Sequence, residues 1–367
     1  MDERELTEEQ MALEKEMREL QIMMDPTLRP QSISSAALMD QDYVPAEFVV
    51  KGLLPKGLTI LGGSPKIGKS WMVLDLCHHV AKGEPFLGME VTQGTVWYLS
   101  YEDNSDRMKH RLACIGADGL ENFQISTREH ELGTMAGDLP EAVDRFMREH
   151  PDTKLIVMDT MQLAKGSSKE PQYGGDYADT GAFKALADKH RVALLLVHHL
   201  RKAADSDPFN EFSGSTGITG AADTLMVLKK SGRMADVAKL SCTGRDIAQR
   251  ELELRFDRQN FHWHKISDSA DLETVPLPPE MEKFAEFARI TQSFDGTNTA
   301  LAEAFCAYSG ITIGAKGLKQ KMNRWCCVLA DLGIRYHSYN TCDGRMVTVT
   351  YTPPTTQTTH TTQNICA

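Results

Sequence analysis

The chain has 367 residues, of which 41% are hydrophobic and 25% charged, and its formal net charge is −11 at pH 7. This length suits one large domain or two smaller ones, and the acidic balance argues against a protein that coats nucleic acid with its whole surface. No apolar run approaches the ~20 residues that cross a bilayer, and the eight cysteines include no C-x-x-C pair. We therefore expect a cytoplasmic protein with reduced thiols and no membrane partner.

The first 37 residues are predicted to form an acidic helical arm followed by a linker. Residues 1–26 carry nine acidic and three basic side chains, with leucines and methionines spaced between them. This pattern indicates an exposed amphipathic helix. Pro26, Pro30 and the serine-rich stretch to Ser35 indicate the linker. Two interpretations of the arm stay open: it contacts a primase or an initiator, or it is a solvated helix that binds nothing.

Residues 38–275 are predicted to form an α/β domain, because strand-like and helix-like segments alternate there. Such alternation specifies a mostly parallel sheet with helices on both faces. The predicted strands are Leu58–Leu61, Thr95–Ser100, Leu155–Asp159, Val192–His198 and Thr224–Lys229, and the predicted helices are Ser105–Ile115, Pro140–Glu149 and Tyr177–His190. Two further strands, Val237–Thr243 and Glu251–Phe256, follow without an intervening helix, so this edge of the sheet is expected to be antiparallel.

A complete G-x-x-x-x-G-K-[ST] phosphate loop follows the first strand of this domain. Its backbone N–H groups and the start of the next helix favour an anion. Lys69 is predicted to reach the β- and γ-phosphates, and the Ser70 hydroxyl is predicted to bind Mg²⁺. The sequence therefore predicts that the chain binds ATP with Mg²⁺. The expected nucleotide contacts are Gly63, Ser64, Pro65, Lys66, Ile67, Gly68, Lys69, Ser70 and Trp71.

Acidic residues at two predicted strand ends complete the expected catalytic centre. The apolar run from Leu155 ends in Asp159, and open α/β sheets bind ligands at the carboxyl ends of their strands. We expect Asp159 to hold Mg²⁺ together with Ser70. An earlier predicted strand runs directly into Glu102 and Asp103. Glu102 is the predicted base for the attacking water, with Asp103 as the alternative base or as a helix cap.

The predicted strand Val192–His198 is followed by His199, Arg201 and Lys202. A polar side chain at this strand end can sense the γ-phosphate and pass its presence to the next loop. We expect His198 to have this role, which His199 could share. The alternative is a histidine whose ring is satisfied by a backbone carbonyl.

A cluster of prolines between Pro276 and Pro279 marks a boundary, after which residues 280–352 are predicted to form a small α+β domain. The expected helices are Ala300–Ala307 and Gly317–Leu332, and the expected strands are Ile334–Ser338 and Met346–Tyr351. Helix, turn, helix and β-hairpin is the order of a winged helix. Residues 353–367 are threonine-rich and polar, which is typical of a disordered tail.

The second helix of this winged-helix-like domain carries Lys319, Lys321 and Arg324. A helix in this position can enter the major groove of DNA, and the three basic side chains are the expected contacts. Docking of another protein is the alternative role for the same surface.

Four segments together resemble the RecA-like ATPases. Among these they are similar to the RepA-type hexameric replicative helicases of plasmids and other mobile elements, which are AAA-family ATPases. The segments are Gly52–Ser70, Tyr98–Asp103, His198–Lys202 and Ser213–Asp223. The resemblance covers roughly residues 38–265. It implies a RecA-like P-loop ATPase core, followed here by the small winged-helix-like domain, in a ring of identical subunits that is expected to be a hexamer.

The resemblance also implies an arginine that reaches the ATP of the neighbouring subunit. In some relatives this arginine precedes the glycine of the small-residue segment, but Ser213 stands there in this chain. We transfer the role to Arg245, which matches the basic position that related ring helicases use at the subunit edge. A local salt bridge is the alternative for Arg245.

Two loops are expected to face single-stranded DNA because the corresponding loops do so in RecA-like proteins. One is Ala164–Gly175, with Lys165 and Lys169, and the other is Leu200–Ser215, with Arg201 and Lys202. A few basic residues on loops suit contact with the DNA backbone rather than with base edges.

These features together predict an ATP-hydrolysing helicase or translocase that acts on single-stranded DNA in the replication of a mobile element. The alternative is a non-motor DNA-binding ATPase that ATP switches, such as a replication regulator, a loader or a recombination mediator. A closed ring that separates strands indicates the first class. Site-specific duplex binding, or filaments on single strands, indicates the second.

Overall fold

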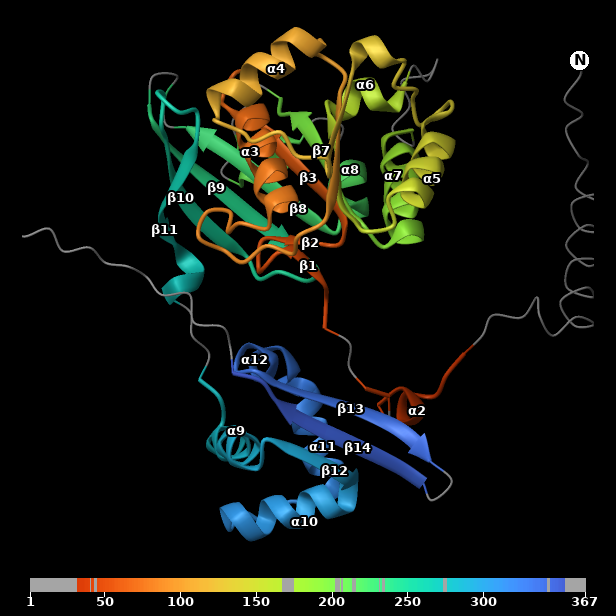
Figure 1. Ribbon diagram of the computed structural model, residues 1–367, viewed down its shortest axis with the longest axis vertical. Coiled ribbons are helices and arrows are strands. Elements are labelled where there is room, and N and C mark those ends of the chain that lie inside the picture. Colours follow the sequence, from red (N-terminus) through yellow and green to blue (C-terminus); the bar gives the residue numbers. More distant parts are fainter. Residues whose placement is uncertain are drawn as a thin grey trace, which may run out of the picture. The chain divides into compact units, whose positions relative to one another are not determined.

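In the computed structural model the chain divides into two units, Ala46–Val275 and the combination of Met1–Pro45 with Pro276–Ala367 (Figure 1). The structure describes residues 32–39, 41–42, 45–166, 175–201, 205, 207–212, 216–230, 232, 235–272, 276–341 and 344–353. In this described part no helix is long and apolar enough to cross a membrane.

The unit Ala46–Val275 is built on a nine-stranded sheet of order β11-β10-β9-β8-β3-β7-β6-β4-β5. The strands β8, β3, β7, β6, β4 and β5 are parallel, and β9, β10 and β11 add an antiparallel edge. The strand bounds are β3 Gly57–Gly63, β4 Thr95–Ser100, β5 Phe123–Thr127, β6 Thr153–Asp159, β7 Ala193–His199, β8 Thr224–Lys230, β9 Val237–Gly244, β10 Arg250–Phe256 and β11 Trp263–Asp268. A separate hairpin of β1 (Phe48–Val50) and β2 (Leu54–Pro55) precedes β3.

Helices cover both faces of the parallel strands, as Figure 1 shows for α3 and α4 on one side and α5, α6 and α7 on the other. The helix bounds are α3 Lys69–Lys82, α4 Ser105–Cys114, α5 Leu139–Glu149, α6 Met161–Lys165, α7 Gly175–His190 and α8 Thr216–Ala221. Alternate residues of one strand supply the two cores: Val197 of β7 packs with α3, whereas Leu196 packs with α5 and α7. This period of two explains why the central strands are apolar throughout.

The predicted α/β class, the parallel core and the antiparallel edge are confirmed. Two strands of the nine-stranded sheet were not expected. The strand β5 is half-buried at the edge of the sheet, and β11 mixes polar and apolar residues, so neither shows the continuous apolar run that identified the others.

The unit that contains the C-terminal part is a small antiparallel α+β fold. Its order is α9 (Pro279–Thr291), β12 (Ser293–Thr297), α10 (Asn298–Ser309), α11 (Ala315–Arg324), α12 (Cys326–Asp331), β13 (Ile334–Thr341) and β14 (Gly344–Tyr351). Its sheet has the order β12-β14-β13. Phe284, Phe305 and Leu329 lie at the centre of its core. The short helix α2 (Ser35–Met39) belongs to the same unit.

One predicted helix of this unit is wrong in detail. The expected helix Gly317–Leu332 is two helices, because the backbone at Trp325 leaves helical geometry (φ −106°, ψ 14°). The helix α9 and the strand β12 were not expected. They place a helix and a strand before the helix-turn-helix, so three strands rather than two form the sheet.

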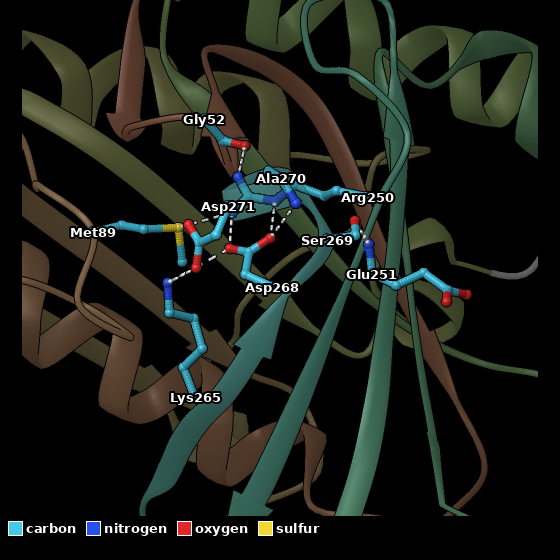
Figure 2. Close-up of polar contacts among 9 residues, drawn as sticks. All are labelled: Gly52, Met89, Arg250, Glu251, Lys265, Asp268, Ser269, Ala270 and Asp271. Atoms are coloured by element: carbon cyan, nitrogen blue, oxygen red, sulfur yellow. Dashed lines mark hydrogen bonds and ion pairs between the residues drawn. The ribbon is translucent and has the colours of Figure 1, made fainter. Parts of the chain in front are cut away.

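A buried ion pair lies at the antiparallel edge of the unit Ala46–Val275 (Figure 2). Arg250 on β10 and Asp268 on β11 form a salt bridge, and their side chains are only 10% and 0% exposed. Arg250 Nη1 also donates a hydrogen bond to the Gly52 carbonyl at 2.6 Å, and the Ala270 amide donates to Asp268 at 3.0 Å. Arg250 therefore ties the turn between β1 and β2 to the last two strands of the sheet.

Replacing Asp268 by asparagine is expected to destabilise the fold by about 3–5 kcal/mol, because it leaves the Arg250 charge buried without a partner. Burial raises the pKa of Asp268, but hydrogen bonds from Arg250 and the Ala270 amide and the charge of Lys265 outweigh this, and the pKa is lowered. The contribution of the Asp268 carboxylate to the free energy of unfolding is therefore present above its unfolded-state pKa of ~4. It is lost as the pH falls through the lower pKa of the folded state.

Thermal unfolding followed by circular dichroism tests this expectation. The midpoint of Asp268→Asn should lie well below that of the wild type at pH 7, and the gap should narrow on acidification below about pH 4. The matched control is Asp271→Asn, which removes an exposed carboxylate 3.4 Å from Lys265. Equal midpoints for Asp268→Asn and the wild type at pH 7 would contradict the assignment.

Candidate functional site

The phosphate loop joins the end of β3 to the start of α3 and has the backbone geometry of an anion site. Gly68 adopts φ +109° as the residue before the first turn of α3. A Cβ at this position would approach the Trp263 ring to 3.0 Å. The 14-residue helix α3 then directs its first free N–H groups toward the loop. Glycine is therefore required here both for the backbone angle and for the space.

Lys69 is the buried cation of the site, with only 4% of the residue exposed. Its Nζ lies 2.6 Å from the Gly63 carbonyl oxygen, 3.1 Å from the Ser64 carbonyl oxygen and 3.3 Å from His199 Nδ1. Burial lowers the pKa of Lys69 to about 8, against the opposing effect of the Asp159 and Glu102 carboxylates. The ammonium is thus hydrogen-bonded to uncharged carbonyl oxygens of its own loop. These contacts do not neutralise its positive charge, so it is suited to an anionic ligand.

Asp159 is held at the carboxyl end of β6 by a tyrosine of the neighbouring strand. Ser100 of β4 pairs with Asp159 in the sheet, and the Tyr98 hydroxyl donates to Asp159 Oδ2 at 2.7 Å. Burial raises the pKa of Tyr98 well above its usual value, so the phenol stays a donor. Sequence reasoning did not assign this role to Tyr98, although a hydroxyl inside an otherwise apolar strand is a recognisable signal.

Ser70 carries a hydroxyl and Asp159 a carboxylate, and both are oxygen ligands of the kind that Mg²⁺ accepts. Ser70 lies in the first turn of α3, immediately after Lys69. In the described ranges no cluster of three or more His, Cys, Asp or Glu side chains is arranged to hold a metal ion. A Mg²⁺ site of the phosphate-loop type needs few protein ligands, because nucleotide phosphates and waters complete the coordination.

The two acids after β4 have different surroundings. The Glu102 side chain is 52% exposed, and its Oε1 lies 3.8 Å from His199 Nε2. Asp103 is buried and forms ion pairs with Arg107 at 3.0 Å and Arg111 at 2.8 Å. Asn104, rather than Asp103, caps α4 by accepting from the Arg107 amide. Asp103 is therefore committed to two arginines, and Glu102 is the acid that faces the site.

The structure brings His199, rather than His198, to the phosphate loop. Adjacent residues of a strand point to opposite faces, and His199 lies on the face of Lys69 and Glu102. His198 is buried and stacks on Phe212, with ring centroids 6.0 Å apart. The expectation for His198 therefore moves to its neighbour, because period-two alternation separates the two rings.

Arg245 lies away from the phosphate loop of its own chain. It follows Gly244, which pairs with Thr224 and so lies near the start of β3, whereas the phosphate loop follows the end of β3. Its side chain is 57% exposed, and its guanidinium lies 3.2 Å from Asp223. The local ion pair is thus formed, and more than half of the side chain stays exposed to solvent.

The basic loop residues are less open than expected. Lys165 is buried, and its Nζ lies 3.5 Å from Asp179. Arg201 is exposed and donates a hydrogen bond to the Asn210 carbonyl. Lys169 and Lys202 lie outside the described residues. Arg201 is therefore the one of these four predicted DNA contacts that the described structure presents to solvent.

The basic residues of α11 also have partners within their unit. Lys319 lies 3.6 Å from Asp42, and Lys321 forms an ion pair with Glu280 of α9. Arg324 is exposed, with its guanidinium 5.9 Å from the centre of the Trp325 ring. The expected DNA-contacting helix thus exposes Arg324 but not the ammonium of Lys319.

A hairpin from the end of the domain supports the phosphate loop, and sequence reasoning did not anticipate it. Trp263 Nε1 donates to the Gly68 carbonyl at 3.2 Å across 195 positions of the chain. Phe261 stacks on Trp71 with ring centroids 4.4 Å apart, and the Arg111 guanidinium lies 5.4 Å from the centre of the Trp71 ring. Because β11 was not expected, no local signal pointed to these contacts.

Fold and site together define a RecA-like P-loop ATPase domain. The sequence pattern of a family described as "AAA domain" matches residues 25–205. P-loop ATPases in general use ATP with Mg²⁺. The chain also shares its fold with a solved structure titled "The Structure Of A DnaB-Like Replicative Helicase And Its Interactions With Primase". That likeness has a TM-score of 0.52 and 12% identity, and covers 70% of this chain and 76% of the other.

Curated relatives match a smaller part of the chain. The DNA repair protein RadA of Mycobacterium tuberculosis is 27% identical over 154 residues, which are 41% of this chain and 28% of the relative. RadA of Synechocystis is 25% identical over 162 residues, which are 41% of this chain and 30% of the relative. The match thus spans less than a third of these relatives' own length.

Nucleotide binding is expected to take up a proton at mildly alkaline pH. With the pKa of Lys69 at about 8 in the free protein, roughly three quarters of the molecules lack this proton at pH 8.5, but only about a tenth at pH 7. A bound phosphate raises the pKa of the ammonium, so uptake should increase from about 0.1 to about 0.7 proton per nucleotide between these pH values.

Calorimetric titration of a non-hydrolysable ATP analogue in buffers of different ionisation enthalpy measures this uptake. Lys69→Arg is the control, because a guanidinium stays protonated and should show no such rise. Uptake that does not change between pH 7 and pH 8.5 in the wild type would show that Lys69 is fully protonated before the nucleotide arrives.

Proposed function

We propose that the protein is an ATP-driven helicase that acts on single-stranded DNA as a ring of identical subunits, in the replication of a plasmid or other mobile element. The observation that carries the hydrolytic part is the convergence of Lys69, His199 and Glu102 around one point, beside Asp159 at the end of β6. The fold shared with a DnaB-like replicative helicase supports the motor, and a ring hexamer is the assembly that the helicase resemblance implies.

The site residues divide the hydrolysis among them. The phosphate-loop amides and the start of α3 hold the β- and γ-phosphates, and Lys69 exchanges its loop carbonyls for phosphate oxygens. Ser70 and Asp159 would hold Mg²⁺, which neutralises charge on the phosphates when bound. Glu102 accepts a proton from the attacking water. At the same time the water oxygen bonds to the γ-phosphorus, and the bond between the γ-phosphorus and the oxygen that bridges to the β-phosphate breaks, which releases ADP.

His199 is proposed as the sensor of the γ-phosphate. Its Nδ1 contacts Lys69 and its Nε2 faces Glu102, so a phosphate that draws Lys69 away from the loop also changes the contacts of this ring. On the other face of the same strand, His198 stacks on Phe212 in the loop after β7. Adjacent residues of β7 therefore contact the nucleotide side and the loop side of the sheet.

Arg245 is proposed to act on the ATP of the next subunit. It lies near the start of β3, whereas its own phosphate loop follows the end of that strand, and this position favours action on the site of another copy. Its guanidinium would leave Asp223 to stabilise the charge that develops on the γ-phosphate.

DNA contact is proposed through Arg201 on the loop after β7, with Lys202 and Lys169 as further candidates. Lys165 would contribute only after leaving Asp179. Tracking of the backbone by a few cations fits a translocase that does not read sequence. A primase or an initiator remains the proposed partner of the acidic N-terminal arm.

A non-motor ATPase of DNA repair or recombination is the second candidate. The observation in its favour is the sequence similarity to RadA, a DNA repair protein, over 41% of this chain. ATP would then switch assembly on DNA rather than drive strand separation.

ATP-dependent separation of a forked DNA duplex tests the motor. The wild type is expected to release the strand, whereas Lys69→Ala should release none, because the phosphates lose their buried cation. Strand-stimulated ATP hydrolysis without release by the wild type would favour the second candidate. Full hydrolysis by Lys69→Ala would overturn the assignment of the site itself.

Mixing of two inactive variants tests the action of Arg245 in trans. Arg245→Ala should keep nucleotide binding but lose most hydrolysis, since removal of such an arginine costs about 10³-fold or more. A mixture of Arg245→Ala and Lys69→Ala subunits should regain activity, because some interfaces then pair an intact Lys69 with an intact Arg245. Arg258→Ala, which removes an exposed arginine paired with Asp236, is the matched control. Hydrolysis by Arg245→Ala at the wild-type rate would contradict the role.

A further inference from the structure

The carboxylate of Asp42, in the segment before the ATPase domain, contacts the C-terminal fold of its own unit. Its Oδ2 accepts a hydrogen bond from the Ser338 amide and lies 3.8 Å from His337 Nδ1. Its Oδ1 lies 3.6 Å from Lys319 Nζ, and the two side chains are only 19% and 11% exposed. A backbone amide, an ammonium and an imidazole thus surround a single anionic group.

The fold explains why an anion is held at this place. The strand β13 is an edge of the three-stranded sheet, so amides on its outer side have no partner strand. The Ser338 amide therefore needs another acceptor. On α11, Lys319 and Asn323 lie one turn apart, and Asn323 accepts a hydrogen bond from Tyr336 of β13. This contact fixes the helix beside the strand and directs Lys319 to the junction.

The same donors suit a phosphate group of nucleic acid. A carboxylate that accepts from a backbone N–H and faces an ammonium stands in for a phosphate oxygen, which uses the same contacts. Lys316, Gln320 and Arg324 are exposed at four-residue intervals on α11, and Lys316, three residues before Lys319, neighbours it on the helix surface. The anion site therefore lies beside a row of polar and basic side chains with the spacing of one helix face.

We propose that the α11–β13 surface binds the phosphate backbone of duplex DNA, and that Asp42 occupies its anion site in the free protein. DNA binding by this unit then requires Asp42 to leave. The inference rests on the proposed function as a DNA-acting ATPase. The sequence before Asp42 is negatively charged and therefore repels DNA, since its first 26 residues contain nine acidic and three basic side chains. Asp42 and the arm therefore lower the apparent affinity for DNA together.

Binding of a duplex of about 20 base pairs to the full-length chain at low salt, followed by fluorescence anisotropy, tests the proposal. Asp42→Ala should bind about five- to tenfold more tightly, because the anion site no longer has to be vacated. Glu47→Gln is the matched control, because it removes a nearby acid whose partner is Lys56 of the ATPase unit, and its affinity should equal that of the wild type. Lys319→Gln should weaken DNA binding and reduce the slope of log K against log[salt] by about one. In the double variant it should abolish the gain in affinity from Asp42→Ala.

Hydrogen exchange of the Ser338 amide reports on the Asp42 contact without DNA. Exchange should be faster in Asp42→Ala than in the wild type or Glu47→Gln, since the amide loses its acceptor. Unchanged exchange would show that Asp42 does not dock, which overturns the proposal. Faster exchange with unchanged duplex affinity would also overturn it, and would favour a protein as the partner of this surface. Strand separation by the wild type alongside either result would leave the proposed function intact.

Discussion

The site depends on one constraint, which is that the central strands of the sheet are buried on both faces. All six residues of β4 are buried, as are six of the seven in β3 and in β7. A polar side chain that must reach solvent or a ligand can therefore emerge only at a strand end. In parallel strands the carboxyl ends meet at the same edge. This geometry alone collects the phosphate loop, Glu102, Asp159 and His199 from segments that are spread over more than a hundred residues of the chain.

Much of this arrangement could be predicted from the sequence because its signals are local. The phosphate loop is one contiguous motif, Asp159 is the last residue of an apolar strand, and Glu102 lies two residues after another. The choice between His198 and His199 could not be made in this way, because it depends on which face of β7 carries α3. The partners of Lys165 and Lys319 were equally invisible, since Asp179 and Asp42 carry no motif. Local chemistry was thus predictable, whereas the pairing of charges across the fold was not.

The antiparallel edge links stability to the nucleotide site. The strand β11 carries Trp263, which bonds the Gly68 carbonyl at one end, and Asp268, which pairs with Arg250 at the other. Loosening of that ion pair therefore acts on the strand that supports the phosphate loop. Gly68 requires the space that the Trp263 ring leaves, so the loop and the hairpin fit each other. A late segment with little sequence signal thus helps to define the most recognisable motif of the chain.

The distribution of charge bears on how an acidic protein can act on DNA. Three of the basic side chains expected at DNA are paired with carboxylates of the same chain: Lys165 with Asp179, Lys319 with Asp42, and Lys321 with Glu280. Binding of DNA at these positions is then an exchange of one anion for another rather than the filling of an open basic surface. An exchange gains less free energy than new ion pairs would, because each lysine loses a partner as it gains a phosphate. Contacts of this kind are weak and readily reversed.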